Sequence, residues 1–239
     1  MFFKGINHYG DLGLILDFGS DSSQQISQEV NAVYALLQDL DLPQLNIIPS
    51  FNKIVLAFQS RKDRNQAQDA IEHNLAKANL TNSQKDRKLW NIPACYDDSY
   101  ALDRELIQTT HGLSKEEVIS KHTGTSYYVY YIGFMPGFPY LGDIDPSLIT
   151  PRLATPRIQI PARSIGIAKE HTCVYPKVSP GGWNIIGQVP FDIFSLEHSR
   201  TSLFLPGDTV QFQSISEKKF LQIQSKHLAF DEIIKEFSK

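Results

Sequence analysis

The sequence has little of what defines several large classes of protein. Its 239 residues include 2 cysteines, Cys95 and Cys173, which are too few for a disulfide framework or, by themselves, for a zinc site. The 23 basic and 26 acidic side chains leave a net charge of −3, without the basic excess that favours binding to a phosphate backbone. The longest apolar runs, such as residues 12–16, fall far short of the roughly 18 residues that a membrane helix needs. We therefore expect neither nucleic acid nor a membrane as a partner.

Signals for export and for self-contained catalysis are missing as well. The first residues show no basic segment leading into an apolar stretch, so we expect a cytoplasmic protein. The sequence contains no phosphate-binding loop, no nucleophile elbow, no His-Glu-x-x-His pair and no dinucleotide-binding fingerprint. Its 7 histidines lack the spacing of metal ligands, so no metal is expected. The chain alone is a poor candidate for an ATPase.

What is present is typical of a folded globular chain, with 41% hydrophobic and 21% charged residues and a mean hydropathy of −0.25. The first part of the chain alternates between short β-rich runs and amphipathic helices. Apolar residues at spacings of three and four predict a helix that follows Asp21-Ser22-Ser23 and ends before Pro43, and another over residues 63–79. The predicted strands cover residues 3–7, 13–18, 45–48 and 53–58. The order β-β-α-β-β-α predicts a small sheet with helices on one face.

A polar stretch over residues 79–88 separates this part from one of different composition. Because such stretches often carry few tertiary contacts, we expect one domain over residues 1–84 and another over residues 85–239. In the second domain we expect a short helix near residues 101–110, another after the Ser-x-x-Glu capping box at Ser114, and a closing helix or tail over 225–239. Ten of the 13 prolines lie within residues 136–206, which leaves room for short strands only. This pattern favours an antiparallel barrel or sandwich.

Two segments rich in glycine, proline and aromatic residues are suited to binding a ligand. Glycine lets the backbone approach a ligand closely, proline stiffens the loop, and aromatic rings supply a stacking wall. The first segment, residues 131–142, contains Phe134, Pro136, Gly137 and Phe138. The second, residues 179–187, contains Gly181, Gly182 and Trp183. An alternative stays open for both, namely a stiff loop or tight turn that packs its aromatic rings into the core.

Three arginines, Arg152, Arg157 and Arg163, lie in the proline-stiffened segment between these two. Guanidinium groups on a rigid backbone suit bidentate binding of carboxylate or phosphate, although a solvated surface stripe is the alternative. His122, at a predicted helix end, suits acid–base chemistry near neutral pH and equally suits capping of the helix.

These segments, in their order and spacing, resemble the PxpB/KipI family, which is also described as allophanate hydrolase subunit 1, or the carboxyltransferase domain, subdomain C and D. The matching stretches are Gly133-Phe134-Met135-Pro136-Gly137-Phe138-Pro139-Tyr140-Leu141, the Thr-Pro-Arg repeat at Thr150 and Thr155, Ile160-Pro161-Ala162, Val174-Tyr175-Pro176 and Ser179-Pro180-Gly181-Gly182-Trp183. The resemblance covers nearly the whole chain. It implies a ferredoxin-like α+β domain followed by a cyclophilin-like antiparallel β-barrel.

The resemblance also implies one component of a multi-subunit enzyme, inactive alone. In an ATP-dependent 5-oxoprolinase, the B subunit opens 5-oxoproline to glutamate together with the C subunit, which is KipA-like, and the A subunit, which is a lactam-utilisation protein. ATP is then a cofactor of the complex. Two alternatives stay open: a KipI-like inhibitor that binds a sensor histidine kinase, and a carboxyltransferase or allophanate-hydrolase-type component that acts on urea-derived amides.

Carried over position by position, the resemblance implies a cleft lined by the glycine- and proline-rich segments, with His122 beside it. We expect the arginines to hold charge that develops on oxygen, and His122 or His171 to move protons. Two positions depart from the family pattern: Arg163 stands where members commonly have glycine, and His171 where they commonly have glutamine. The candidate catalytic residues are therefore His122, Arg163 and His171. The candidate substrate-binding residues are Phe134, Pro136, Gly137, Phe138, Arg152, Arg157, Gly181, Gly182 and Trp183.

Overall fold

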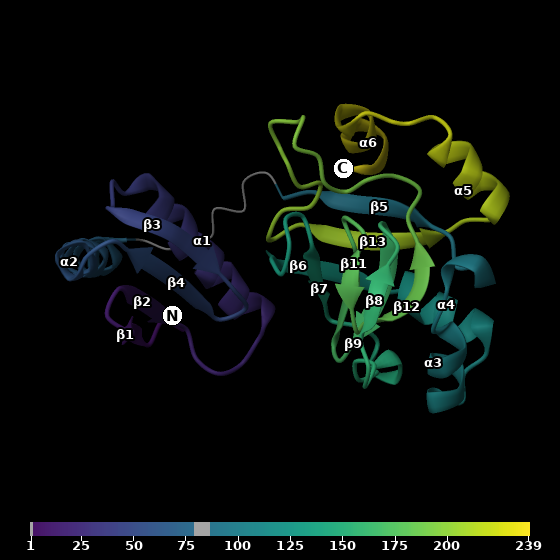
Figure 1. Ribbon diagram of the computed structural model, residues 1–239, viewed down its shortest axis with the longest axis horizontal. Coiled ribbons are helices and arrows are strands. Elements are labelled where there is room, and N and C mark those ends of the chain that lie inside the picture. Colours follow the sequence, from purple (N-terminus) through teal and green to yellow (C-terminus); the bar gives the residue numbers. More distant parts are fainter. Residues whose placement is uncertain (1, 79–86) are drawn as a thin grey trace. The chain divides into compact units, whose positions relative to one another are not determined.

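A computed structural model describes residues 2–78 and 87–239 of the chain. The chain divides into two compact units, residues 1–86 and 87–239, and each is described here by itself (Figure 1). The expected boundary between residues 84 and 85 lies outside the described residues, as does Asn79 at the expected end of the second helix. No helix within the described ranges is long and apolar enough to cross a membrane.

The first unit has the predicted order of elements. They are β1 (Gly5–Tyr9), β2 (Gly13–Asp17), α1 (Gln24–Asp39), β3 (Gln44–Pro49), β4 (Lys53–Phe58) and α2 (Arg61–Lys77). The strands form one sheet in the order β1-β2-β4-β3, and every neighbouring pair is antiparallel. This sheet does not confirm the ferredoxin-like arrangement that the resemblance implies.

Alternation along the strands and helical spacing build the core of this unit. Buried residues in β4 occur at every second position, at Ile54, Leu56 and Phe58, so one face of the sheet is apolar. Ser23 and Ser60 precede the two helices as N-cap residues, and their hydroxyl groups accept hydrogen bonds from backbone N–H groups of the first helical turn. Both helices contribute apolar side chains to a single core with the sheet.

The second unit is built around a seven-stranded sheet in the order β12-β9-β10-β7-β6-β13-β5. Its strands are β5 (Leu89–Ala94), β6 (Ser126–Ile132), β7 (Pro139–Gly142), β9 (Ser164–Ala168), β10 (His171–Val174), β12 (Asn184–Gln188) and β13 (Thr209–Ser214). A separate ribbon pairs β8 (Arg157–Ile160) with β11 (Ser179–Gly181). The helices are η1 (Asp98–Tyr100), α3 (Arg104–His111), α4 (Lys115–Thr123), η2 (Pro146–Leu148), α5 (Glu217–Gln224) and α6 (Phe230–Phe237).

Two features of this unit differ from the sequence-based expectation. The pair β5–β13 is parallel, so the sheet is not purely antiparallel. The end of the chain forms two helices, α5 and α6, and α5 begins well before residue 225. The expectation of one closing element missed α5 because its eight residues carry only two buried apolar side chains, Phe220 and Ile223.

The sheet curls until its two edge strands meet. Cys95, directly after β5, and Gln188, at the end of β12, exchange two backbone hydrogen bonds of 2.9 Å each. The curled sheet encloses a core to which strands and helices both contribute, among them Trp90, Ile107, Val129, Ile165 and Phe212. Helix α6 packs beside β5 and brings the last residues back to the start of this unit (Figure 1).

Asp208, just before β13, is a buried carboxylate that joins distant parts of the second unit. One oxygen accepts from the backbone N–H of Lys88 at 3.0 Å, and the other accepts from the indole Nε1 of Trp90 at 2.8 Å and from the Leu205 N–H at 3.0 Å. Arg200 approaches the second oxygen at 3.2 Å and lies 5.5 Å from the Trp90 ring centre. A buried charge with this many donors is fully compensated, and its loss would leave all of them unsatisfied.

We expect Asp208→Ala to lower the free energy of unfolding by roughly 3–5 kcal/mol, because it strands an arginine, an indole N–H and two backbone N–H groups. Urea denaturation followed by circular dichroism measures the loss. The matched control is Asp98→Ala, which removes an ion-paired carboxylate that is 81% exposed and screened by solvent, so its effect should be far smaller. Equal losses in the two variants would contradict the role given to Asp208.

Candidate functional site

The curled sheet carries a second apolar layer on its outer face. Side chains alternate between faces along each strand, so Leu141 and Val174 point into the main core while Tyr140 and Cys173 belong to the outer layer. The outer layer also contains Phe138, Ile160, Ala168, Tyr175, Trp183 and Ile185. The loop of residues 133–138 contributes Phe138 to this layer, and strand β8 of the ribbon contributes Ile160. The segments singled out in the sequence therefore meet in three dimensions.

Aromatic rings dominate this meeting point. We define the aromatic cluster as Tyr131, Phe134, Phe138, Tyr140, Tyr175 and Trp183. Phe138 lies at its centre, with ring centres 5.4 Å from Phe134, 5.1 Å from Tyr175 and 5.7 Å from Trp183. Edge-to-face contacts at these distances stabilise an aromatic group beyond simple burial. Phe138 is 1% exposed and Phe134 is 65% exposed, so the cluster runs from the core to the surface.

The loop that carries Phe134 holds a strained backbone. Phe134 has φ = 69°, in the left-handed region where side chains other than glycine are disfavoured. Gly137 has φ = 79°, and a Cβ atom there would lie 2.7 Å from Cβ of Phe194, so only glycine fits. Pro136 is exposed between them. An exposed aromatic ring held in a strained conformation is characteristic of a functional surface.

The second glycine-rich segment supports the cluster from the other side. A Cβ atom on Gly181 would lie 2.4 Å from the Tyr175 hydroxyl oxygen, so glycine is required for this close approach. Gly182 is less constrained, since its nearest neighbour would be the Leu153 carbonyl oxygen at 3.6 Å. Trp183 itself is buried in the cluster. The alternative in which these motifs pack aromatic rings into the core thus holds for Phe138 and Trp183, and not for Phe134.

The three candidate arginines have different surroundings. Arg152 is exposed, and its guanidinium lies 5.8 Å from the centre of the Trp183 ring, which places a positive charge beside the aromatic cluster. Arg157 forms two hydrogen bonds, of 2.7 and 2.6 Å, with the buried carboxylate of Asp103. Asp103 also accepts from the backbone N–H of Ile185 at 2.7 Å. The guanidinium of Arg157 is therefore occupied by a structural ion pair that docks the start of α3 on β12.

His122 lies in the core, with no exposed surface. Its Nε2 is 3.0 Å from the Thr172 hydroxyl, which donates to the Gly166 carbonyl, so Nε2 carries the proton and donates to Thr172. Nδ1 is then the acceptor of a 2.8 Å hydrogen bond from the Tyr96 hydroxyl. Burial lowers the pKa of His122 to about 3, so the ring is neutral at physiological pH.

This placement corrects two expectations about His122. The ring does not cap helix α4, because it turns inward instead of toward the last carbonyl groups. A fully buried ring with both nitrogens bonded does not reach a substrate in this conformation. Its hydrogen bond to Thr172 instead fixes β10, where His171 is the preceding residue.

His171 is the partly exposed first residue of β10, paired with Gly142 and Ala168 in the neighbouring strands. Its ring centre is 5.9 Å from that of Tyr130, whose hydroxyl donates to Asp143 at 2.9 Å. Burial lowers the pKa of His171 below its ordinary value. A mostly neutral imidazole at the start of this interior strand is a suitable proton acceptor for a substrate that reaches it.

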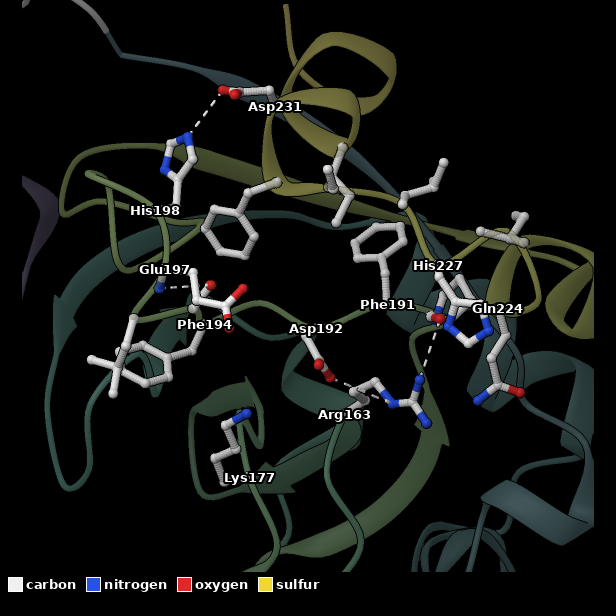
Figure 2. A pocket seen from close by; sticks show the side chains of 18 residues that line it. Arg163, Lys177, Phe191, Asp192, Phe194, Glu197, His198, Gln224, His227 and Asp231 are labelled. Carbon is white, nitrogen blue, oxygen red and sulfur yellow. Dashed lines mark hydrogen bonds and ion pairs between the residues drawn. The ribbon is translucent and has the colours of Figure 1, made fainter.

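Arg163 lies apart from the other two arginines, in the wall of a cavity of about 720 Å³ (Figure 2). It has φ = 69°, in the left-handed region that favours glycine, which is the residue that the family resemblance implied at this position. Its Nη1 is 3.4 Å from the Pro190 carbonyl oxygen, and its Nε is 4.0 Å from the Asp192 carboxylate. Phe194 lines the same cavity and also packs against Gly137, so the cavity borders the strained loop.

The rest of the cavity wall was not foreseen. It includes Lys177, Asp192 and Glu197, and residues of α5, α6 and the turn between them such as Gln224, His227 and Asp231. His198 lies 2.9 Å from Asp231, and this hydrogen bond raises the pKa of the imidazole. Only the departure at Arg163 signalled this region in the sequence. Within the described ranges no group of three or more His, Cys, Asp or Glu side chains is placed to hold a metal ion.

Comparison with known proteins identifies the class of this chain as a carboxyltransferase-type domain. The family model for the carboxyltransferase domain, subdomain C and D, matches residues 4–204, and the chain belongs to this family. Over 227 residues the chain is 33% identical to the B subunit of 5-oxoprolinase from Bacillus subtilis (strain 168), covering 90% of this chain and 94% of the relative. The resemblance drawn from the motifs is confirmed.

Solved structures give the same picture of the fold. The crystal structure of TTHA0988 is similar with a TM-score of 0.74 and 30% identity over 85% of this chain, which spans only 40% of that longer protein. The urea carboxylase of Kluyveromyces lactis is similar with a TM-score of 0.72 and 16% identity over 93% of this chain, which spans 22% of that protein. At such low identity, the second likeness concerns the fold alone.

The strained loop generates a prediction about stability. We expect Phe134→Gly to change the free energy of unfolding by less than about 1 kcal/mol, because relief of the left-handed conformation offsets the added flexibility of the unfolded chain. Phe138→Ala, in the same loop but buried, should cost roughly 3–5 kcal/mol. Thermal and urea unfolding of the two variants measure this contrast. A large loss for Phe134→Gly would show that this ring is structural.

The buried His122 predicts how stability depends on pH. Its folded pKa, about 3, lies below the ordinary value of 6.5, so the unfolded chain binds a proton more readily. The stability that the neutral His122 ring contributes is fully present above about pH 6.5, and it is lost as the pH falls toward the folded pKa. We expect urea unfolding between pH 7.5 and 4.5 to show a shallower pH dependence for His122→Gln than for the wild type. The same substitution at the exposed His227 is the control, and identical profiles in all three proteins would refute a neutral buried ring.

Proposed function

We propose that the chain is the B subunit of an ATP-dependent 5-oxoprolinase, which opens 5-oxoproline to glutamate together with partner subunits. The name and high coverage of the Bacillus subtilis relative support this assignment. The observation that carries the proposal within the structure is the meeting of the three sequence motifs at one surface. There Phe134 is exposed, Trp183 supports the aromatic cluster, and Arg152 supplies a positive charge.

The proposed assembly has several parts. The chain acts as two domains, over residues 1–84 and 85–239, with the ferredoxin-like and cyclophilin-like folds that the family resemblance implies. Its partners are the C subunit of 5-oxoprolinase, which is KipA-like, and the A subunit, which is a lactam-utilisation protein. ATP is used by the complex, which works in the cytoplasm, and this chain is inactive alone. The naming of relatives as one subunit of an enzyme supports the need for partners.

The chemistry of the proposed reaction assigns different tasks to the charged groups. ATP transfers its terminal phosphoryl group to the lactam carbonyl oxygen, water adds to the carbonyl carbon, the C–N bond breaks and the nitrogen takes up a proton. A second water molecule releases the phosphoryl group from the acyl phosphate, so the products are glutamate, ADP and phosphate. Arg152 holds negative charge on oxygen and His171 moves protons, whereas Arg163 lies in the wall of a separate cavity and has no task in this step. His122 positions β10 through Thr172 and does not exchange protons itself.

The aromatic cluster has a binding task in this scheme. The exposed ring of Phe134 offers an apolar wall to the flat lactam ring, the buried Trp183 supports the cluster behind it, and Arg152 attracts the carboxylate of the lactam. Arg157 does not take part in binding, but its ion pair with Asp103 supports the structure beneath this surface. Pro136 and the glycines at 137, 181 and 182 shape the loops that carry these side chains.

The test is co-expression of this chain with the C and A subunits, followed by measurement of ADP and glutamate formed from 5-oxoproline, with urea as a parallel substrate. We expect glutamate formation that disappears when this chain is omitted. A stable complex without turnover of either amide would contradict the proposal and turn attention to binding of a histidine kinase.

Two matched variants then test whether the aromatic cluster binds the substrate. Phe134→Gly, which is expected to fold normally, should lower turnover of 5-oxoproline by roughly tenfold or more through loss of a binding wall. The control is Leu196→Ala, which removes another exposed apolar side chain, outside the aromatic cluster. Equal activity of both variants would remove Phe134 from the site.

A further inference from the structure

The cavity that contains Arg163 has the size of a small-molecule site. Its volume of about 720 Å³ lies within the range of roughly 300–1,000 Å³ that is usual for ligand pockets. Its apolar wall includes Phe191, Phe194, Phe230 and Ile233, while charged groups occupy both ends (Figure 2). Helices α5 and α6 provide part of this wall, and both lie beyond residue 204, where the family match ends.

A neutral acceptor, the side-chain amide of Gln224, lies against the Arg163 guanidinium at the place where an anion would bind. In the amide orientation that satisfies both groups, the Gln224 oxygen accepts from Nη2 at 2.8 Å and from Nη1 at 3.1 Å. A carboxylate binds such a pair of N–H donors with charge assistance, roughly twice as strongly as a neutral acceptor. A ligand carboxylate can therefore displace the Gln224 oxygen from the guanidinium.

The charges around the cavity favour one negative group at this end only. Lys177 adds a second positive charge to the lining, and Asp192 is the acidic neighbour of Arg163, 4.0 Å from Nε. The opposite end carries Glu197 and the His198–Asp231 pair (Figure 2). Glu197 would repel a second carboxylate on the ligand, whereas Asp231 is already paired with His198.

We propose that this cavity binds a small monocarboxylate with an apolar body. The carboxylate lies on Arg163 in place of the Gln224 oxygen, and the body packs against the phenylalanine side chains. Such a ligand is larger than a five-membered lactam. The proposal goes beyond the proposed function and does not depend on it, because binding to this chain alone is sufficient to test it.

The test uses the full chain and three probes: 3-phenylpropionate, its neutral amide 3-phenylpropanamide, and the dicarboxylate 3-(4-carboxyphenyl)propionate. Isothermal titration calorimetry measures the affinity of each. We expect 3-phenylpropionate to bind at least about tenfold more tightly than either of the other two. No binding of 3-phenylpropionate, or equal binding of acid and amide, would overturn the proposal.

Variants then separate the carboxylate contact from general effects on the cavity. Arg163→Gly and Arg163→Gln should each weaken 3-phenylpropionate about tenfold without changing the thermal midpoint by an amount that indicates unfolding. Gln224→Ala should strengthen binding by roughly threefold, because the competing acceptor is gone. The matched control is Gln222→Ala on the same helix, an exposed glutamine outside the cavity lining. Unchanged affinity in both Arg163 variants, or equal effects of the two glutamine variants, would also overturn the proposal.

Discussion

The carboxylate of Asp208 is the interaction on which much of the second unit depends. It joins the start of β5, through Lys88 and Trp90, to the turn that leads into β13. Because β5 and β13 are the parallel pair at one edge of the sheet, this carboxylate sets their register from the first residue. Arg200 extends the same network into the segment that carries His198 and the cavity wall. One buried charge therefore supports both the sheet and the surroundings of the candidate ligand site.

Asp103 and His122 show the same principle at smaller scale. Each is a buried polar group whose hydrogen bonds are satisfied, and each connects a helix to a strand: Asp103 joins α3 to β12, and His122 joins α4 to β10. Fully satisfied buried groups of this kind fix one arrangement of the elements, since any other arrangement leaves donors without acceptors. The exposed loops with Phe134 and Arg163 can keep strained conformations because the scaffold beneath them is determined in this way.

Much of the fold followed from pattern alone. Apolar spacing gave the order of elements in the first unit, and the Ser114 capping box gave the start of α4. The parallel pairing of β5 with β13 was not predictable, because the two strands are more than a hundred residues apart and no local signal links them. The apolar run over residues 191–194 forms no regular strand and makes one isolated bridge, between Phe194 and Ser202.

The site was predictable to the extent that it lies in motifs. Phe134, Phe138, Arg152 and Trp183 come together as their segments suggested. The role of Arg157 was hidden, since its partner Asp103 lies 54 positions away and an arginine looks the same in sequence whether or not its guanidinium is occupied. The cavity around Arg163 was equally hidden, because its wall is assembled from short segments between residues 163 and 233.

The closure of the sheet has a mechanical consequence. Neighbouring strands elsewhere in this sheet share at least two residue pairs, whereas Cys95 and Gln188 join the edges through a single bridge. Because few hydrogen bonds hold this seam, we expect it to open locally at lower free energy than the longer ladders, without separation of neighbouring strands. We expect the curvature of the sheet to adjust at this seam, while the outer face that carries the aromatic cluster retains its shape.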